Sequence, residues 1–187
     1  MLYEKESGLK SQVLASGVNP FLYWASWWVI FLAMSCLTGC FLGFGFWWAV
    51  FYDASLLLIV SFFSLVCLSA LSLVWALLPL CMSEKWSELI ILPVFFYLCA
   101  SHALIDQTHL SVPADQKRSA SYSAMVAAKE TLLLMTQFSS NSFGLNFDNY
   151  GEVRANYSVK LGFEMLAIDA SIYFAIGCVL EAIVLLV

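Results

Sequence analysis

The sequence predicts an all-α integral membrane protein with about four transmembrane helices and an extramembrane loop that contains an amphipathic helix. Hydrophobic residues make up 62% of the 187 residues and charged residues only 11%, and the mean hydropathy is +0.86. A water-soluble domain has about twice that charged fraction. Such a chain cannot cover a surface that faces water, whereas a surface that faces lipid needs no charge.

The charged residues are scattered along the chain and form no basic cluster. They comprise 13 acidic and 8 basic residues, with a formal net charge of -5. Nucleic acid is therefore not expected as a partner, whereas membrane lipids and other membrane protein subunits are. The sequence contains no glycine-rich phosphate loop, serine elbow or zinc-protease signature, so we do not expect an enzyme that acts on its own.

Two long apolar runs predict the first two spans. Residues 20–50 contain no charged residue, which predicts a first helix longer than the roughly 20 residues that a span needs. Asp53 interrupts the run and predicts a tight hairpin, after which residues 54–82 form the second span. Pro79 is expected to kink or end that second helix.

Two further spans and one loop complete the prediction of a single membrane domain. Residues 83–88, SEKWSE, form a charged turn that leads into a third apolar run, 88–105, which is only just long enough to span. The last run, 160–187, predicts the fourth span. Between them, residues 106–158 are the one sizeable segment expected outside the membrane.

Within this loop, residues 119–138 have the composition of a helix with one apolar face. A helix lying on the membrane or against a partner fits this pattern. The residues expected on the apolar face are Tyr122, Met125, Val126, Leu132 and Leu133.

Small residues recur at every fourth position of the first span. Ser35, Gly39 and Gly43 predict a smooth strip that lets another helix approach closely. The partner is either the second span of the same chain or a helix of another chain. In the first case the facing small residues are Ser61, Ser64, Ser69 and Ser72.

Both histidines of the chain lie near the end of the third run, with an aspartate between them. His102, Asp106 and His109 share one face if that helix continues past Ile105. They could bind a metal ion, relay protons, or contact haem b or a quinone through His102 or His109. The simpler interpretation, which we favour, is that the helix meets water there and that no cofactor is bound.

This histidine spacing resembles that of one family. His102, His109 and Leu110 are similar to the membrane-anchor subunits of succinate dehydrogenase, where a haem-ligating histidine is followed seven residues later by another histidine and then leucine or methionine. The resemblance implies a membrane anchor that contacts haem. Asp106 and Thr108 stand where that family has glycine and arginine, and the long loop has no counterpart, so three matching positions do not assign the chain to the family.

Three acidic residues lie in the last span. Glu164, Asp169 and Glu181 point in different directions around a helix, at about 0°, 140° and 260°, so they form no single acidic stripe. Lys160, one turn before Glu164, is its expected partner. Asp169 and Glu181 are expected either to be protonated or to meet a counter-charge from a neighbouring subunit.

Together these features predict a structural or accessory transmembrane subunit of a larger membrane complex. An energy-transducing, respiratory-type membrane is compatible with it, either the bacterial cytoplasmic membrane or the mitochondrial inner membrane. The first alternative is a redox or ion-handling anchor subunit that contacts haem, quinone or metal through His102, Asp106 and His109. The second is an oligomeric channel or transporter.

Overall fold

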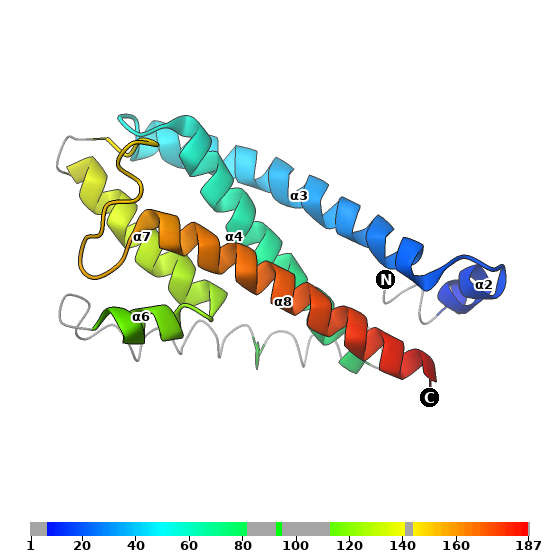
Figure 1. The fold of residues 1–187 in the computed structure, drawn as a ribbon. Helices are drawn as coiled ribbons and strands as arrows, with labels where there is room; N and C mark the ends of the chain where they lie inside the picture. The colour runs from blue at the N-terminus through cyan, green and yellow to red at the C-terminus, as the bar shows by residue number, and fades with distance from the viewer. Residues whose placement is uncertain (1–6, 82–92, 95–112, 141–143, 187) are drawn as a thin grey trace.

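The structure is a computed structural model and describes residues 7–81, 93–94, 113–140 and 144–186 (Figure 1). These residues form helices and turns, with one isolated antiparallel bridge between Arg154 and Tyr157. The elements are α2 (Leu9–Ala15), α3 (Pro20–Ala49), α4 (Leu56–Leu77), the 3-10 helix η1 (Leu78–Leu80), α6 (Ala114–Ala120), α7 (Ala124–Ser140) and α8 (Val159–Leu186).

Three of the helices are long and apolar enough to cross a membrane. They cover Pro20–Ala49, Leu56–Leu80 and Val159–Ile183, which matches three of the four predicted spans. The predicted third span, 88–105, lies outside the described residues apart from Pro93 and Val94. That fourth crossing stays a prediction.

The central helix of the bundle is α4, which contacts both α3 and α8. Figure 1 shows that α3 runs antiparallel to α4, whereas α8 runs in the same direction as α4. An aromatic cluster joins all three helices far from the α3–α4 turn. There the Trp28 and Phe174 ring centroids are 4.2 Å apart, and Trp75 lies 5.8 Å from Phe174 and 5.9 Å from Phe31.

Local sequence signals explain where α3 and α4 begin and end. The Asn19 side chain accepts a hydrogen bond from the backbone N–H of Phe21 at 2.9 Å, and Pro20 occupies the first helical position. The α3–α4 hairpin is present as predicted, although Ser55 rather than Asp53 precedes α4. Pro79 ends α4 as expected, because the chain continues there as η1.

The helix expected over residues 119–138 begins only at Ala124, as α7, and of the five residues predicted on its apolar face Val126 is the one that is buried. Residues 121–123 separate α6 from α7. Tyr122 is exposed and lies outside α7, and Leu132 and Leu133 are only partly buried. The inward face is set by packing against α8 and α4, which the local sequence does not reveal. Its buried residues are Val126, Ala127, Glu130, Thr131, Leu134, Met135 and Phe138.

We call α6, α7 and residues 144–158 the cap, because they cover the bundle beside the α3–α4 turn (Figure 1). The backbone N–H of Ser55 donates to the carbonyl of Leu145 at 2.8 Å, and the Ser139 hydroxyl donates to the carbonyl of Val50 at 3.0 Å. Gly144 has a φ of +52°, and a Cβ there would overlap the carbonyl oxygen of Asp53. The cap is therefore held tightly to the turn that joins the first two spans.

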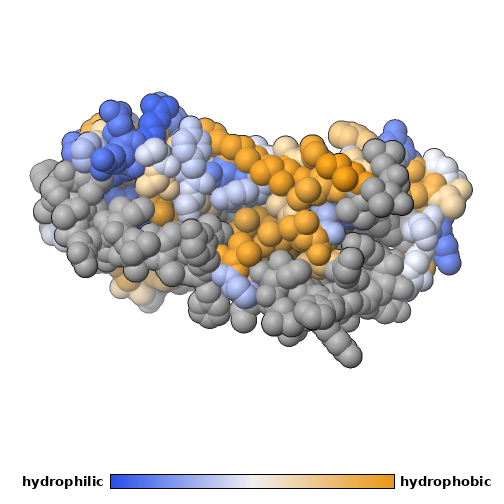
Figure 2. Space-filling model, turned by 90° about the horizontal axis from the view of Figure 1, so that it is seen from below, coloured by the Kyte–Doolittle hydropathy of each residue, from blue (hydrophilic) through white to orange (hydrophobic). Residues whose placement is uncertain are grey.

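The main hydrophobic core lies between the cap and the adjoining ends of α4 and α8. Figure 2 shows hydrophilic residues gathered at the cap end and hydrophobic residues gathered in the middle of the visible face. Among the described helices, α3 carries the most exposed large hydrophobic side chains. The core consists of Phe51, Ala54, Leu58, Ile59, Phe62, Ala127, Leu134, Met135, Phe138, Leu145, Tyr157, Val159, Met165 and Leu166.

Candidate functional site

The predicted histidine and aspartate cluster lies outside the described residues. His102, Asp106 and His109 therefore stay candidates for metal, haem or quinone contact. Within the described ranges, no group of three or more histidine, cysteine, aspartate or glutamate residues could hold a metal ion. The polar chemistry of those ranges is concentrated elsewhere, beneath the cap.

A buried ion pair joins α6 to α7. The Lys117 ammonium, with a side chain only 2% exposed, lies 3.4 Å from Oε2 of Glu130. The same Nζ donates a hydrogen bond of 2.7 Å to the backbone carbonyl of Ala155. One lysine thus connects α6, α7 and the hairpin that precedes α8.

The carbonyl that Lys117 contacts belongs to a tight two-residue turn. Ala155 and Asn156 both have positive φ, 50° and 61°, and the flanking residues Arg154 and Tyr157 exchange two backbone hydrogen bonds. Positive φ at both central positions is the geometry of a type I′ hairpin. Alanine is uncommon in the left-handed region, because this conformation costs a residue with a Cβ about 1–2 kcal/mol.

Tyr157 enters the same buried region from the hairpin. Its side chain is 1% exposed, and its hydroxyl has no hydrogen bond of good geometry among the described residues. Burial raises the pKa of Tyr157 to about 12; the hydroxyls of Ser121 and Thr131 oppose this effect, and the carboxylates of Glu130 and Asp169 add to it. The phenol therefore remains protonated at neutral pH and faces several oxygen atoms.

Asp169 completes this group of side chains from α8. It is 2% exposed, and its Oδ2 has no hydrogen-bond partner among the described residues. Helices α7 and α8 approach closely nearby, since a Cβ on Gly162 would overlap the Thr131 hydroxyl. We call Lys117, Glu130, Tyr157 and Asp169 the buried polar cluster.

The other two acids of α8 lie apart from this cluster. Glu164 is exposed, and its Oε1 lies 4.0 Å from the Lys160 ammonium, which is the predicted pair. Glu181 is buried, and it lies twelve residues beyond Asp169, or about 18 Å along the helix axis. The three acids therefore diverge as their spacing predicts.

The predicted small-residue strip lies at the crossing of α3 and α4. Ser35, Gly39 and Gly43 are all buried in α3. A Cβ on Gly39 would overlap the backbone of Ser64, and one on Gly43 would lie 2.7 Å from Cα of Val60. The strip therefore packs against the second span of the same chain. This span was the first of the two expected partners.

Helix α8 uses two glycines for close packing that the sequence analysis missed. Gly162 adjoins Thr131 of α7, and Gly177 adjoins the Trp75 indole of α4. These glycines are isolated along the sequence and lack a repeat every fourth residue. Their spacing therefore gave no signal of a packing role.

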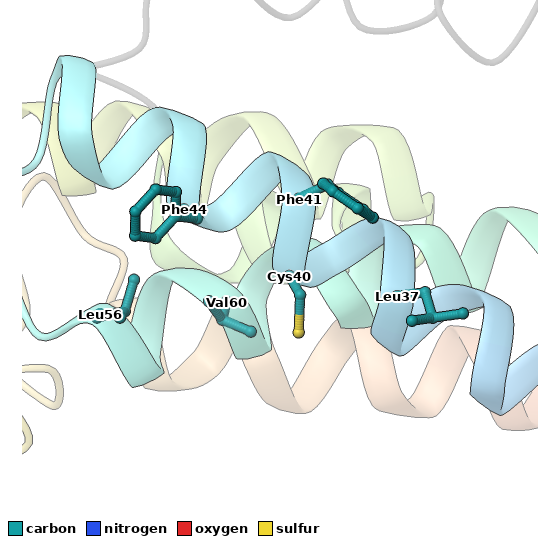
Figure 3. Close-up of a pocket in the computed structure, with 6 residues that line it drawn as sticks. All are labelled: Leu37, Cys40, Phe41, Phe44, Leu56 and Val60. Carbon is teal, nitrogen blue, oxygen red and sulfur yellow. The ribbon is translucent and has the colours of Figure 1, made fainter.

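The outer side of the α3–α4 pair carries an apolar groove of about 510 Å³ (Figure 3). Phe41, which borders it, is 81% exposed. An apolar surface of this kind can accept a lipid acyl chain or an apolar side chain, and it offers little for hydrogen bonding. The lining residues are Leu37, Cys40, Phe41, Phe44, Leu56 and Val60.

The buried polar cluster was not predicted as a unit from the sequence. Lys117 and Glu130 lie in the loop where solvent exposure is the ordinary expectation for charged residues. One signal was available: Glu130 interrupts a stripe formed by Val126, Leu134 and Phe138, and a charge within an apolar stripe requires a buried partner. The identity of that partner depends on how α6 folds against α7.

Comparison with known proteins assigns no family to this arrangement. No family model matches the chain, and no curated protein sequence matches it significantly.

Proposed function

We propose that the chain is a structural or accessory transmembrane subunit of a larger multi-subunit membrane complex, and that the outer face of α3 contacts a neighbouring subunit. The observation that carries this proposal is the exposure of α3. In the most apolar part of α3 only 17% of the residues are buried, against 33% in α4 and 28% in α8. The buried residues of α3 are Tyr23, Ser35, Gly39 and Gly43.

The shape of this exposed face supports contact with another helix. A second apolar groove, of about 250 Å³, adjoins the first and shares Phe41 with it. Gly45 lines this groove, and nothing lies within 4 Å of where its Cβ would be. Small residues beside bulky ones create hollows into which side chains of a neighbouring helix can fit.

The use of charge in the cap also favours a structural role. Lys117 and Glu130 pair with each other across two helices, and Arg154 lies 3.1 Å from Glu152 while its guanidinium covers the Phe138 ring at 3.9 Å. These contacts hold the elements of the cap to one another. A cap stabilised in this way suits a subunit that presents a fixed surface to its neighbours.

The test combines isolation from the native membrane with crosslinking from one position. A photoreactive amino acid replaces Phe41, and a matched one replaces Val179, which is also well exposed but lies on α8. Intact complexes are first weighed by native mass spectrometry, without crosslinking. We expect other chains in fixed stoichiometry, and we expect Phe41 to crosslink to one of those same chains.

The contrary outcomes separate the proposal from its alternatives. A monomer that crosslinks only to lipid would overturn it, and a complex containing only copies of this chain would favour the oligomeric channel or transporter. Crosslinks to a subunit from Val179 but not from Phe41 would overturn the assignment to α3. A haem spectrum or bound metal that is lost in His102→Ala or His109→Ala would favour the redox or ion-handling anchor.

A further inference from the structure

The buried polar cluster contains more negative than positive charge. When all of its groups are ionised, Lys117 contributes one positive charge, and Glu130 and Asp169 contribute one negative charge each. The Lys117 ammonium already lies 3.4 Å from Glu130 and 2.7 Å from the Ala155 carbonyl. Asp169 therefore adds a second buried carboxyl to a cluster that contains one ammonium.

The surroundings of Asp169 do not favour a carboxylate. It is 2% exposed, and its Oδ2 is without a hydrogen-bond partner among the described residues. A buried carboxylate needs a counter-charge or several hydrogen-bond donors, and otherwise takes up a proton. One added proton removes the excess negative charge of the whole cluster.

The titratable groups around Asp169 come from every element packed there. Tyr157 of the hairpin and Tyr173 of α8 itself are influenced by the charge of Asp169. Glu130 of α7 also acts on Tyr157, and Lys117 of α6 pairs with Glu130. In α4, which is described throughout, Cys67 is the single titratable residue. Tyr173 donates a hydrogen bond of 3.4 Å to the Tyr122 carbonyl, which fixes it at the junction of α6 and α7.

Tyr157 is placed to connect Asp169 with the ion pair. Its hydroxyl is buried and makes no hydrogen bond of good geometry among the described residues. Both Glu130 and Asp169 are close enough to raise its pKa. A phenol near two carboxyls can donate to one oxygen while accepting from a protonated neighbour or a water molecule.

We infer that Asp169 is a proton-binding site inside the first half of α8, and that Tyr157 and the Lys117–Glu130 pair, which belong to the cap, link it to water on the cap side. The proton comes from water on the cap side and binds a carboxylate oxygen of Asp169. The net charge of the cluster changes from -1 to zero. Glu164, which is exposed, lies only about 7.5 Å from Asp169 along the helix axis, so the path to water is short.

The test is infrared spectroscopy of the full chain in lipid nanodiscs, recorded as the pH is varied. Carbon-13 labelling of aspartate carboxyls separates their bands from those of glutamate without disturbing the fold. We expect a protonated aspartate C=O band at neutral pH that disappears in Asp169→Asn and persists in Glu164→Gln. Absence of this band from the wild-type chain, or its persistence in Asp169→Asn, would overturn the inference.

A second variant tests the charge argument and remains informative if Asp169→Asn does not fold. In Glu130→Gln, the cluster loses one carboxylate while Lys117 keeps its positive charge. The labelled aspartate band should then titrate at lower pH and be weakened or lost at neutral pH. An unchanged titration midpoint would overturn the shared-charge cluster. This result is independent of whether the chain has partner subunits.

Discussion

The cap and the α3–α4 hairpin hold their helices together in opposite ways. The cap buries large side chains such as Phe138 and Tyr157 together with a charged pair. The hairpin brings two backbones together at Gly39 and Gly43, while large side chains such as Phe41 remain outside. The cap thus packs through large buried side chains, and the hairpin packs through small residues that let two backbones approach.

The difference fits the expectation that the cap lies in water and the hairpin in lipid. Large apolar groups of the cap leave water when they are buried, so the hydrophobic effect favours their burial. Helices surrounded by lipid gain little from that effect, and close van der Waals contact between small residues becomes the main attraction. Gly39 and Gly43 thus fit packing in lipid, whereas the large buried side chains of the cap fit packing in water.

The largest expected effect comes from breaking the ion pair of the cap. Lys117→Met retains most of the side-chain volume but leaves Glu130 buried without its ammonium partner. Loss of one member of a buried pair lowers the free energy of unfolding by about 3–5 kcal/mol. Thermal unfolding in detergent, followed by circular dichroism, measures this loss.

The matched control is Arg118→Met, at the next position of the same helix. Arg118 is exposed, so its loss should change stability by no more than about 0.5 kcal/mol. If the two substitutions lowered the free energy of unfolding equally, the buried pair would not be what stabilises the cap. The double variant Lys117→Met, Glu130→Leu should recover much of the lost stability, because no unpaired charge remains.

The next largest effect tests close packing in the hairpin. Gly39→Ala places a Cβ against the backbone of Ser64, which cannot move aside as a flexible side chain would. Overpacking of this kind lowers stability by about 1–3 kcal/mol. Resistance to unfolding by sodium dodecyl sulfate in mixed micelles reports the change.

Gly45→Ala is the control in the same helix. Nothing lies within 4 Å of its Cβ position, and alanine favours a helix over glycine by about 0.5–1 kcal/mol. This variant should therefore be neutral or slightly stabilised. Destabilisation of both variants alike would contradict the close α3–α4 crossing.

A smaller effect tests the junction between the two regions. Gly144→Ala forces a non-glycine residue to a φ of +52° and toward the Asp53 carbonyl. The left-handed conformation alone costs about 1–2 kcal/mol. Thermal unfolding should show this loss, whereas Gly151→Ala, in open space within the same loop, should have almost no effect. Similar losses for both would mean that residue 144 does not fix the cap to the hairpin.

Sequence reasoning was most successful where structure depends on neighbouring residues. The uninterrupted apolar run before Asp53 and the proline at position 79 specify two spans and their limits. The strip of Ser35, Gly39 and Gly43 was predictable because a repeat every fourth residue defines one face of a helix.

It was less successful where structure depends on distant residues. The buried face of α7 includes Glu130 and Thr131, and these positions are buried because α6 and α8 meet them from far along the chain. Asp169 was recognised as an intramembrane acid, but its neighbour Tyr157 could not be identified without the fold. Gly162 gave no signal, because its role depends on the position of Thr131.

The smallest expected effect concerns a charge pair that the sequence predicted. Lys160 and Glu164 are separated by 4.0 Å, and both side chains are more than half exposed. An exposed pair at this spacing contributes only about 0.3–0.5 kcal/mol, because water already solvates both charges. Glu164→Gln should therefore leave the unfolding temperature almost unchanged, and added salt should remove any remaining difference. A loss as large as that of Lys117→Met would contradict this interpretation and would place the start of α8 in a much less polar environment than its exposure indicates.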